Sequence, residues 1–483
     1  MFQLSSRAVR GARSASALVC AAVLAACANF DGIHATVSPL TAQQLALKAG
    51  TASEAPPLAT DWWIAYGDPQ LNDLVQQALA QHPSLHMAKA RLDRAQALGD
   101  TAYALSRPTL NAGVDLNLQR YTANGMIPPP IAGTTRETGT LQATGSWELD
   151  FFGKHRAALE SALGQVRAAQ ADAQAARMLL VTMVARNYFQ WARLQAQLEV
   201  ARRTLAQREQ LLGLVQDRVR AGLDTQLEWE QSAGNLPEAR LQIESLLEQI
   251  QLARNAIATL IAKPNEPLTL TPPAQAAITS VAIGSSLPID LLSRRADIAA
   301  AKQRVLAATK DVENAKAQFY PNINLVAFAG WSSMGFDRLL EAGSQQWGVG
   351  PAIRLPLFDA GRLRAQLRGK TADLDAAIAS YNSTVIEAIH EATDQLASAQ
   401  AVRKQQAEQA QAQEKAQAAY DIARQRFEAG LATSLQVLSA ETAVLAQRRQ
   451  AIDLAARALD TQVLLSRALG GGYHDETLAA ALP

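Results

Sequence analysis

The sequence predicts a mainly α-helical fold with a smaller β portion of the kind that crosses a membrane as a barrel. Three observations support this prediction. Two runs without proline, between Gly153 and Gly222 and between Gly361 and Gly430, are far longer than an ordinary globular helix. Segments of about ten residues alternate between apolar and polar side chains, as barrel strands do. The chain also repeats itself, so that each kind of segment occurs twice.

The first residues have the pattern of a secretory signal that ends in a lipobox. Three arginines precede an apolar run that is too short to span a bilayer, and the run closes on Leu24, Ala25, Ala26 and Cys27. This ending resembles the site at which bacterial lipoprotein processing attaches lipid to a cysteine. We therefore predict a signal peptide over residues 1–26 and a covalent lipid on Cys27. A stray cysteine after an ordinary signal is the alternative.

The composition argues against nucleic acid as a partner, against a disulfide in the mature chain and against a membrane-spanning helix. The formal net charge is +1 at pH 7, which offers no basic surface for nucleic acid. The only other cysteine, Cys20, lies within the predicted signal, so the mature chain is expected to have no disulfide. After the signal no segment approaches the roughly 20 apolar residues of a spanning helix, so any membrane crossing must use strands.

The two halves of the chain read as duplicates. Gly222 recurs as Gly430 in the similar segments RVRAGLDTQLE and RFEAGLATSLQ, 208 positions apart, whereas Pro108 recurs as Pro321 at a separation of 213. The separation differs by five positions, so the two repeats differ in length between the proline and the long helix, in the region of the alternating segments. We divide the mature chain into a first repeat over 27–270, a second repeat over 271–475 and a tail over 476–483.

Each repeat contains a predicted β-hairpin, at about 109–151 and about 322–358. Apolar and polar residues alternate from Leu110 to Gln119 and again in the return strand, whereas the second hairpin alternates weakly and Pro351 is expected to interrupt its return strand. One lipid-facing side and one wet side suit a membrane barrel. Because four strands cannot close alone in lipid, several chains would share one barrel. A soluble sheet with one wet face is the alternative.

The rest of each repeat predicts a long helical hairpin, over 153–260 and 361–469. In the first, a four-three spacing of apolar residues indicates one coiled-coil-like helix, which at 1.5 Å per residue reaches on the order of 100 Å. Its apolar positions are Leu159, Leu163, Val166, Ala173, Leu180, Val184, Trp191, Leu194, Leu198, Ala201, Leu205, Leu212, Val215 and Val219. Four residues break this seam: Gln170, Arg177, Asn187 and Arg208. A ring of such hairpins could enclose a water-filled duct, and a solid helical bundle is the alternative.

Five segments resemble the outer-membrane efflux proteins, the family of TolC-like channels, and the lipobox points to the lipoprotein branch of that family. They are DWWIAYGDPQLNDLV from Asp61, SWELDFFGKHRAAL from Ser146, SLPIDLLSRRADIAAAK from Ser286, LPLFDAGRLRAQL from Leu355 and ALGGGY from Ala468. The resemblance covers nearly all of the mature chain. It implies a homotrimer in the bacterial outer membrane, with four strands from each chain in a twelve-stranded β-barrel and a long α-helical coiled-coil barrel in the periplasm.

The resemblance also implies a function and the residues that serve it. Family members are passive exit ducts that dock to a periplasmic adaptor and an inner-membrane pump, which supplies the energy for export of small molecules. The positions that match adaptor-docking tips are Arg218, Gly222, Leu223, Arg426, Gly430 and Leu431. Those that match the periplasmic gate are Phe427, Leu435 and Ser439. Relatives commonly carry Asp where this chain has Ala432 and Ser439. No cofactor is expected besides the lipid on Cys27.

Three rival functions remain open from the residues alone. A metal enzyme is suggested by helical spacing of His82 with His86, and of Glu387 with His390 and Glu391. Because a metal site needs three or more convergent ligands, and the other repeat has no equivalent of the second group, we predict neither metal binding nor catalysis. A structural coiled-coil lipoprotein without transport leaves the hairpins unexplained. A type I protein-secretion duct is the third, since the pump chooses the cargo.

Overall fold

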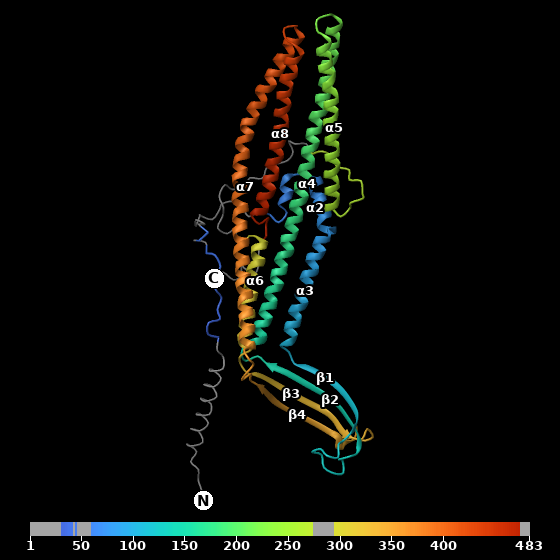
Figure 1. Cartoon of the computed structure of the whole chain (residues 1–483), viewed down its shortest axis with the longest axis vertical. Coiled ribbons are helices and arrows are strands. Elements are labelled where there is room, and N and C mark those ends of the chain that lie inside the picture. Colours follow the sequence, from blue (N-terminus) through green and yellow to red (C-terminus); the bar gives the residue numbers. More distant parts are fainter. Residues whose placement is uncertain (1–29, 42–43, 46–58, 274–293, 474–483) are drawn as a thin grey trace. The chain divides into compact units, whose positions relative to one another are not determined.

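The computed structural model describes residues 30–41, 44–45, 59–273 and 294–473 (Figure 1). The predicted lipidation of Cys27, the signal over 1–26 and the tail over 476–483 lie outside these residues. The chain divides into two compact units. The first unit comprises residues 1–39, 92–169 and 301–382, and the second comprises 40–91, 170–300 and 383–483. Each unit therefore takes segments from both halves of the sequence, and the division into two sequence repeats stays a prediction.

The first unit contains a four-stranded antiparallel sheet in the order β1-β2-β3-β4. Its strands are β1 (Thr109–Arg120), β2 (Thr135–Leu149), β3 (Asn322–Met334) and β4 (Gln345–Arg354), with a short 3₁₀ turn η4 (Ala342–Ser344) before β4. The pairs β1–β2 and β3–β4 are hairpins, and β2 joins β3 with Leu149 opposite Ile323. The centre of the sheet therefore joins one hairpin from each half of the sequence.

Large apolar side chains on the two outer strands are exposed. Leu110 on β1 is 78% exposed, and Trp347 and Val349 on β4 are 78% and 67% exposed. Successive strand residues point to opposite faces, so the alternate apolar residues of each strand share one face. An apolar sheet face of this extent is typical of a surface that another molecule or a lipid covers.

The prediction that Pro351 interrupts the last strand was wrong. Pro351 lies within β4 and opposes Leu325 in the register with β3. Within this chain β4 is an edge strand, where a residue without an N–H is tolerated because one side of the strand has no ladder to complete. The hairpin therefore continues past the proline.

Helices α3 (Pro83–Leu105), α6 (Ala296–Ala317), α4 (Lys154–Arg220) and α7 (Arg362–Glu428) all contribute to the first unit. Small residues bring α4 and α6 together: a Cβ added at Gly164 would lie 3.0 Å from the Cβ of Ala307. The predicted apolar seam is wrong in this part of α4, where Leu163 is 41% exposed. The buried positions are instead Ala157, Ser161, Gly164 and Ala168.

The segment that begins three residues after Cys27 packs on the first unit. The Phe30 ring meets the Phe319 ring edge to face at 5.0 Å. The backbone N–H groups of Thr36 and Val37 donate to the Asp375 carboxylate at 2.9 and 3.0 Å. These contacts fix residues 30–37 along α6 and α7.

The second unit has its own core around η1 (Trp62–Tyr66), α2 (Pro69–Gln81), α4, α5 (Gln226–Leu260) and α8 (Ser434–Ala468). Here the predicted seam is confirmed, because Leu180, Val184, Trp191, Leu194 and Leu198 are all buried. Asp68 ties the N-terminal elements to this core. Its carboxylate accepts the Gln70 N–H at 2.9 Å, which caps α2, and also the Tyr188 hydroxyl at 2.5 Å.

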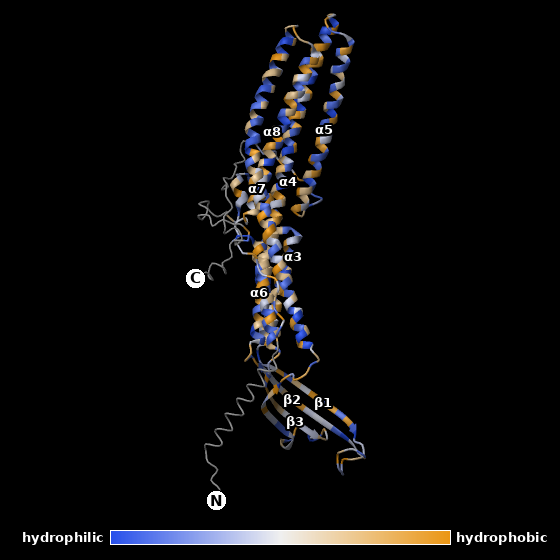
Figure 2. Ribbon diagram, turned by 60° about the vertical axis from the view of Figure 1, so that its left-hand side comes forward, coloured by the Kyte–Doolittle hydropathy of each residue, from blue (hydrophilic) through white to orange (hydrophobic). Residues whose placement is uncertain are grey.

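Two antiparallel helical hairpins, α4–α5 and α7–α8, complete the second unit (Figure 1). Figure 2 shows hydrophilic and hydrophobic residues interspersed along all four helices. Among the described residues, none of the helices combines the length and the hydropathy that a membrane span requires. The mainly α-helical fold with a small antiparallel sheet agrees with the fold class predicted from the sequence.

Candidate functional site

The two hairpin tips have the same backbone turn. At the first tip Gly222 has φ 72°, and the Leu223 N–H donates to the Arg218 carbonyl at 2.9 Å. At the second tip Gly430 has φ 74°, and the Leu431 N–H donates to the Arg426 carbonyl at 2.7 Å. A glycine in the left-handed region followed by this bond is a common helix ending, because glycine has no Cβ to strain there.

Both turns expose a leucine to solvent. Leu223 is 66% exposed and Leu431 is 70% exposed. Neither side chain contributes to the core of the tips, which consists of Val215, Tyr420, Phe427, Val437 and Val444. An exposed leucine at the end of each hairpin suits contact with another protein, and the glycine alone is explained by the turn.

The two tips differ in the way their arginines are held. Arg218 forms an ion pair with Asp224 at 2.8 Å, and its guanidinium lies 4.9 Å from the centre of the Phe427 ring. The hydrogen bond to Asp224 raises the pKa of Arg218. In the second tip Ala432 occupies the position equivalent to Asp224, and among the described residues Arg426 forms no ion pair.

The first residues of the returning helices, α5 and α8, also differ, and again the first hairpin has the more extensive hydrogen bonding. Thr225 caps α5 with its hydroxyl, which accepts the Leu227 N–H at 3.2 Å, while Glu228 accepts the Thr225 N–H at 2.9 Å. This reciprocal capping box is absent from α8, where the side chain of Thr433 makes no capping bond. Because each good cap contributes about 1 kcal/mol, the second turn is held less firmly than the first.

The three predicted gate residues lie in different environments. Leu435 is 61% exposed on the first turn of α8, and Ser439 lies exposed one turn further on. Phe427 is only 1% exposed and lies in the tip core beneath Arg218. Phe427 therefore does not line an open surface of this chain, and its place at the gate stays a prediction.

A buried ion pair behind the tips joins α4 to α8. Arg208 Nε lies 3.2 Å from a carboxylate oxygen of Glu441, and Arg208 also donates to the Asn235 carbonyl of α5 at 3.1 Å. Burial raises the pKa of Glu441, and Arg208 offsets part of this effect. One signal of this contact was visible before the structure, since Arg208 is one of the four residues that break the predicted apolar seam.

Further along the hairpins, α4 and α8 face each other through charged side chains. Arg186 pairs with Asp460 at 2.6 Å, and Arg193 pairs with Asp453 at 2.8 Å. These residues border a polar cavity of about 560 Å³. The four side chains are between 27% and 48% exposed. Ion pairs this exposed contribute little to stability.

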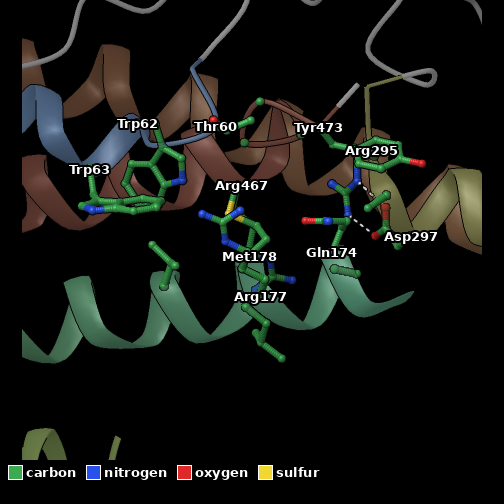
Figure 3. A pocket seen from close by; sticks show the side chains of 17 residues that line it. Thr60, Trp62, Trp63, Gln174, Arg177, Met178, Arg295, Asp297, Arg467 and Tyr473 are labelled. Carbon is green, nitrogen blue, oxygen red and sulfur yellow. Dashed lines mark hydrogen bonds and ion pairs between the residues drawn. The ribbon is translucent and has the colours of Figure 1, made fainter. Parts of the chain in front are cut away.

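Three of the segments that carry the family resemblance meet at a second cavity, of about 230 Å³ (Figure 3). Figure 3 shows Arg295 and Asp297 on one side of it, Trp62 and Trp63 on the other, and Arg467 between them. The Trp62 side chain is buried, and its indole N–H has no hydrogen-bond partner among the described residues.

Arg295 organises this meeting point. Its guanidinium pairs with Asp297 at 2.7 Å and with Glu391 at 3.0 Å, and Arg467 also contacts Glu391 at 3.1 Å. The Arg295 side chain is only 6% exposed. Removal of either the buried cation or its carboxylate partners strongly destabilises the folded protein, because an uncompensated charge is left behind. Sequence reasoning used this segment only as a family marker and missed the network.

The final glycines of the ALGGGY segment fit closely against the same region. Gly470 has φ 93°, and an added Cβ would collide with the carbonyl oxygen of Arg294. A residue with a side chain is therefore excluded there on both conformational and steric grounds. This explains physically why the segment has a glycine at position 470.

Three of the five residues weighed as metal ligands make other contacts. Glu391 binds Arg295 and Arg467, His390 lies 3.6 Å from Asp394, and His82 shares a 2.7 Å contact with Ser84. Over the described part of the chain, no group of three His, Cys, Asp or Glu residues has the arrangement of a metal site.

This combination of a four-stranded sheet, two long helical hairpins and glycine tips defines an outer-membrane efflux channel. The profile of the outer membrane efflux protein family matches residues 74–263 and 287–471, and the chain belongs to that family.

Two relatives and one solved structure resemble this chain over most of their length. The chain is 30% identical over 472 residues to the multidrug resistance outer membrane protein MdtQ of Escherichia coli O157:H7, which covers 95% of this chain and 98% of the relative. It is 36% identical over 375 residues to the fusaric acid resistance protein FusA of Burkholderia cepacia, over 75% of this chain and 70% of FusA. The outer membrane protein VceC of Vibrio cholerae superposes with a TM-score of 0.81 at 35% identity, over 87% of this chain and all of VceC.

Proposed function

We propose that the protein is the outer-membrane exit duct of a tripartite efflux system, formed by three copies of the chain. The observation that carries this proposal is the sheet of the first unit, which has two unpaired edges, β1 and β4, and an exposed apolar face. Open strand edges are not stable in lipid, so β4 of one copy must pair with β1 of the next until the ring closes, with no N–H donated at Pro351. Three copies would supply twelve strands.

The helical hairpins would form the periplasmic part of the duct. The two tips would dock a periplasmic adaptor through Leu223 and Leu431, which are exposed beside the glycine turns. The adaptor would in turn hold an inner-membrane pump that supplies the energy. Leu435 and Ser439 would belong to the periplasmic gate, with Phe427 supporting that segment from the core.

The cargo would be small toxic organic molecules. This part of the proposal rests on the named roles of the relatives in multidrug resistance and fusaric acid resistance. A lipid on Cys27 would add a second attachment to the outer membrane, and residues 30–37 would hold that attachment against the first unit.

In-cell photo-crosslinking from the two tips tests the docking role. A photo-reactive residue at position 223 or 431 is expected to capture a periplasmic adaptor, and deletion of the gene is expected to lower resistance to small organic toxins. Position 241 is the matched control, because Leu241 is 71% exposed on the flank of α5 and lies away from the turn.

Three other results would contradict the proposal. Capture of envelope scaffolding without an adaptor, together with a monomer that conducts no ions in planar bilayers, would indicate a structural lipoprotein. Loss of a secreted protein in the deletion strain, with unchanged toxin resistance, would indicate a type I secretion duct. Equal adaptor capture from position 241 would remove the tips from docking.

A further inference from the structure

A cavity of about 460 Å³ lies in the first unit where the helices meet the sheet. It is bordered by residues 152–160, at the start of α4, and by residues 310–320, at the end of α6. β2 ends at Leu149 and β3 begins at Asn322 (Figure 1), so the residues that border the cavity follow the end of β2 and precede the start of β3.

The charges around this cavity are not balanced pair by pair. Lys310 lies 2.9 Å from Glu160 and 3.0 Å from Glu313, so two carboxylates share one ammonium group. Within the described residues, the side chains of Arg156 and Lys316 form no ion pair. The wall therefore carries two unpaired cations beside one surplus negative charge.

Two aromatic side chains, Phe152 and Tyr320, border the cavity. The rings of Phe152 and Tyr320 stack at 4.9 Å with an angle of 10° between their planes. Phe151 is 67% exposed and Phe358 is 89% exposed, both just beyond strand ends. Exposed aromatic residues at this level are typical of the boundary between lipid tails and head groups.

The depth of the cavity follows from the proposed function, on which this inference rests. If the sheet crosses the membrane, its strand ends mark the edge of the hydrocarbon layer. The cavity then lies at the level of the phospholipid head groups on the periplasmic side, with its two aromatic side chains turned toward the acyl chains.

We propose that this cavity binds the head group of a phospholipid that carries a primary ammonium beside its phosphate, as phosphatidylethanolamine does. Arg156 and Lys316 bind the phosphate, because a charged donor and a phosphate oxygen form strong hydrogen bonds. The surplus carboxylate charge of Glu160 and Glu313 attracts the ammonium group. The acyl chains lie against Phe151 and Phe152.

Native mass spectrometry of the purified full-length assembly tests this site. The protein is exposed to equimolar palmitoyl-oleoyl phosphatidylethanolamine, phosphatidylglycerol and phosphatidylcholine. We expect severalfold more bound phosphatidylethanolamine than phosphatidylcholine, and about a tenfold loss of it in the double variant Arg156→Gln, Lys316→Gln, since two charged hydrogen bonds disappear. Glu313→Gln is expected to abolish the preference for phosphatidylethanolamine over phosphatidylglycerol.

Lys370→Gln is the matched control. Lys370 lies in the same unit, contacts Asp311 at 3.6 Å and Asp373 at 3.4 Å, and does not border the cavity. Its variant is expected to keep wild-type lipid binding. If the double variant does not assemble, Lys316→Gln alone decides, because that side chain is exposed.

Several outcomes would overturn the site. They are equal binding of phosphatidylcholine, unchanged lipid binding in the double variant, or displacement of the lipid by inorganic phosphate alone, which would indicate a simple anion site. Ion conductance and adaptor capture are measured on the same variants. A wild-type protein that conducts ions normally but shows no lipid preference refutes only the lipid site, whereas a wild-type protein without conductance refutes the proposed function.

Discussion

Gly470 is the residue where the structure leaves least room for change. Its φ of 93° and its contact with the Arg294 backbone both exclude a Cβ. Gly470→Ala is expected to lower the free energy of unfolding by about 1–3 kcal/mol or more, measured by thermal unfolding of the purified assembly. Gly369→Ala in α7 is the control, because a Cβ there meets nothing within 4 Å. Its effect should be neutral or stabilising by up to about 1 kcal/mol. Similar losses in both variants would contradict the steric argument.

Leu435 is the residue on which the gate proposal depends. Its side chain is 61% exposed on the first turn of α8, where it is free to contact the Leu435 side chains of the other two copies in the proposed trimer. Leu435→Ala is expected to leak current through the closed channel in a planar bilayer, since a smaller apolar side chain seals a constriction less well. Leu241→Ala removes an exposed leucine from α5 without touching the tip. Unchanged conductance of Leu435→Ala would remove this residue from the gate.

At the scale of elements, the tip of the second helical hairpin lacks the carboxylate that holds the tip of the first. Ala432→Asp places a carboxylate six residues after Arg426, as Asp224 stands after Arg218. We expect slower hydrogen exchange of the Leu431 amide and a stabilisation of the turn below about 1 kcal/mol, as is usual for an exposed pair. The reverse change, Asp224→Ala, should speed exchange of the Leu223 amide. No change in either turn would show that the ion pair does not hold the tips.

The contact between α4 and α8 at Glu441 is expected to depend on pH. Burial raises the pKa of Glu441 above its ordinary 4.5, so the folded state binds this proton more tightly than the unfolded state. The stability that the proton contributes is therefore full below about 4.5 and is lost as pH rises through the folded-state value. Glu441→Gln, which cannot titrate, should flatten this dependence. Hydrogen exchange of α8 from pH 4 to 8 measures it, and identical profiles for both proteins would contradict the prediction.

The elements also show what the sequence could and could not predict. The heptad seam holds from Leu180 to Leu198, where large side chains fill a core. It fails at Leu163, because α4 there packs through Gly164 and Ala168, and a pattern of large apolar residues cannot reveal a face made of small ones. The glycine tips followed from the duplication. The Arg295 network did not, because its partner Glu391 lies 96 residues away and only tertiary structure brings them together.

At the scale of the whole molecule, the proposed lipid on Cys27 can be tested directly. The mature wild-type protein is expected to begin at Cys27 and to exceed the calculated mass of that chain by its acyl groups, as mass spectrometry would measure. Cys27→Ser is expected to lack this excess. The sheet alone should still hold the variant in the outer-membrane fraction. A wild-type mass that equals the unmodified chain would refute the lipid anchor.

The pairing of β2 with β3 also determines when the molecule can finish folding. Leu149 and Ile323 are neighbours in the sheet but stand 174 positions apart in the chain. At roughly 5–20 residues per second of synthesis, the first hairpin waits about 9–35 s before its partner strand exists. During that interval β2 presents an open edge beside an apolar face in an aqueous compartment. A factor that covers the hairpin during this interval would therefore favour correct assembly, because an open strand edge is a template for pairing with other chains.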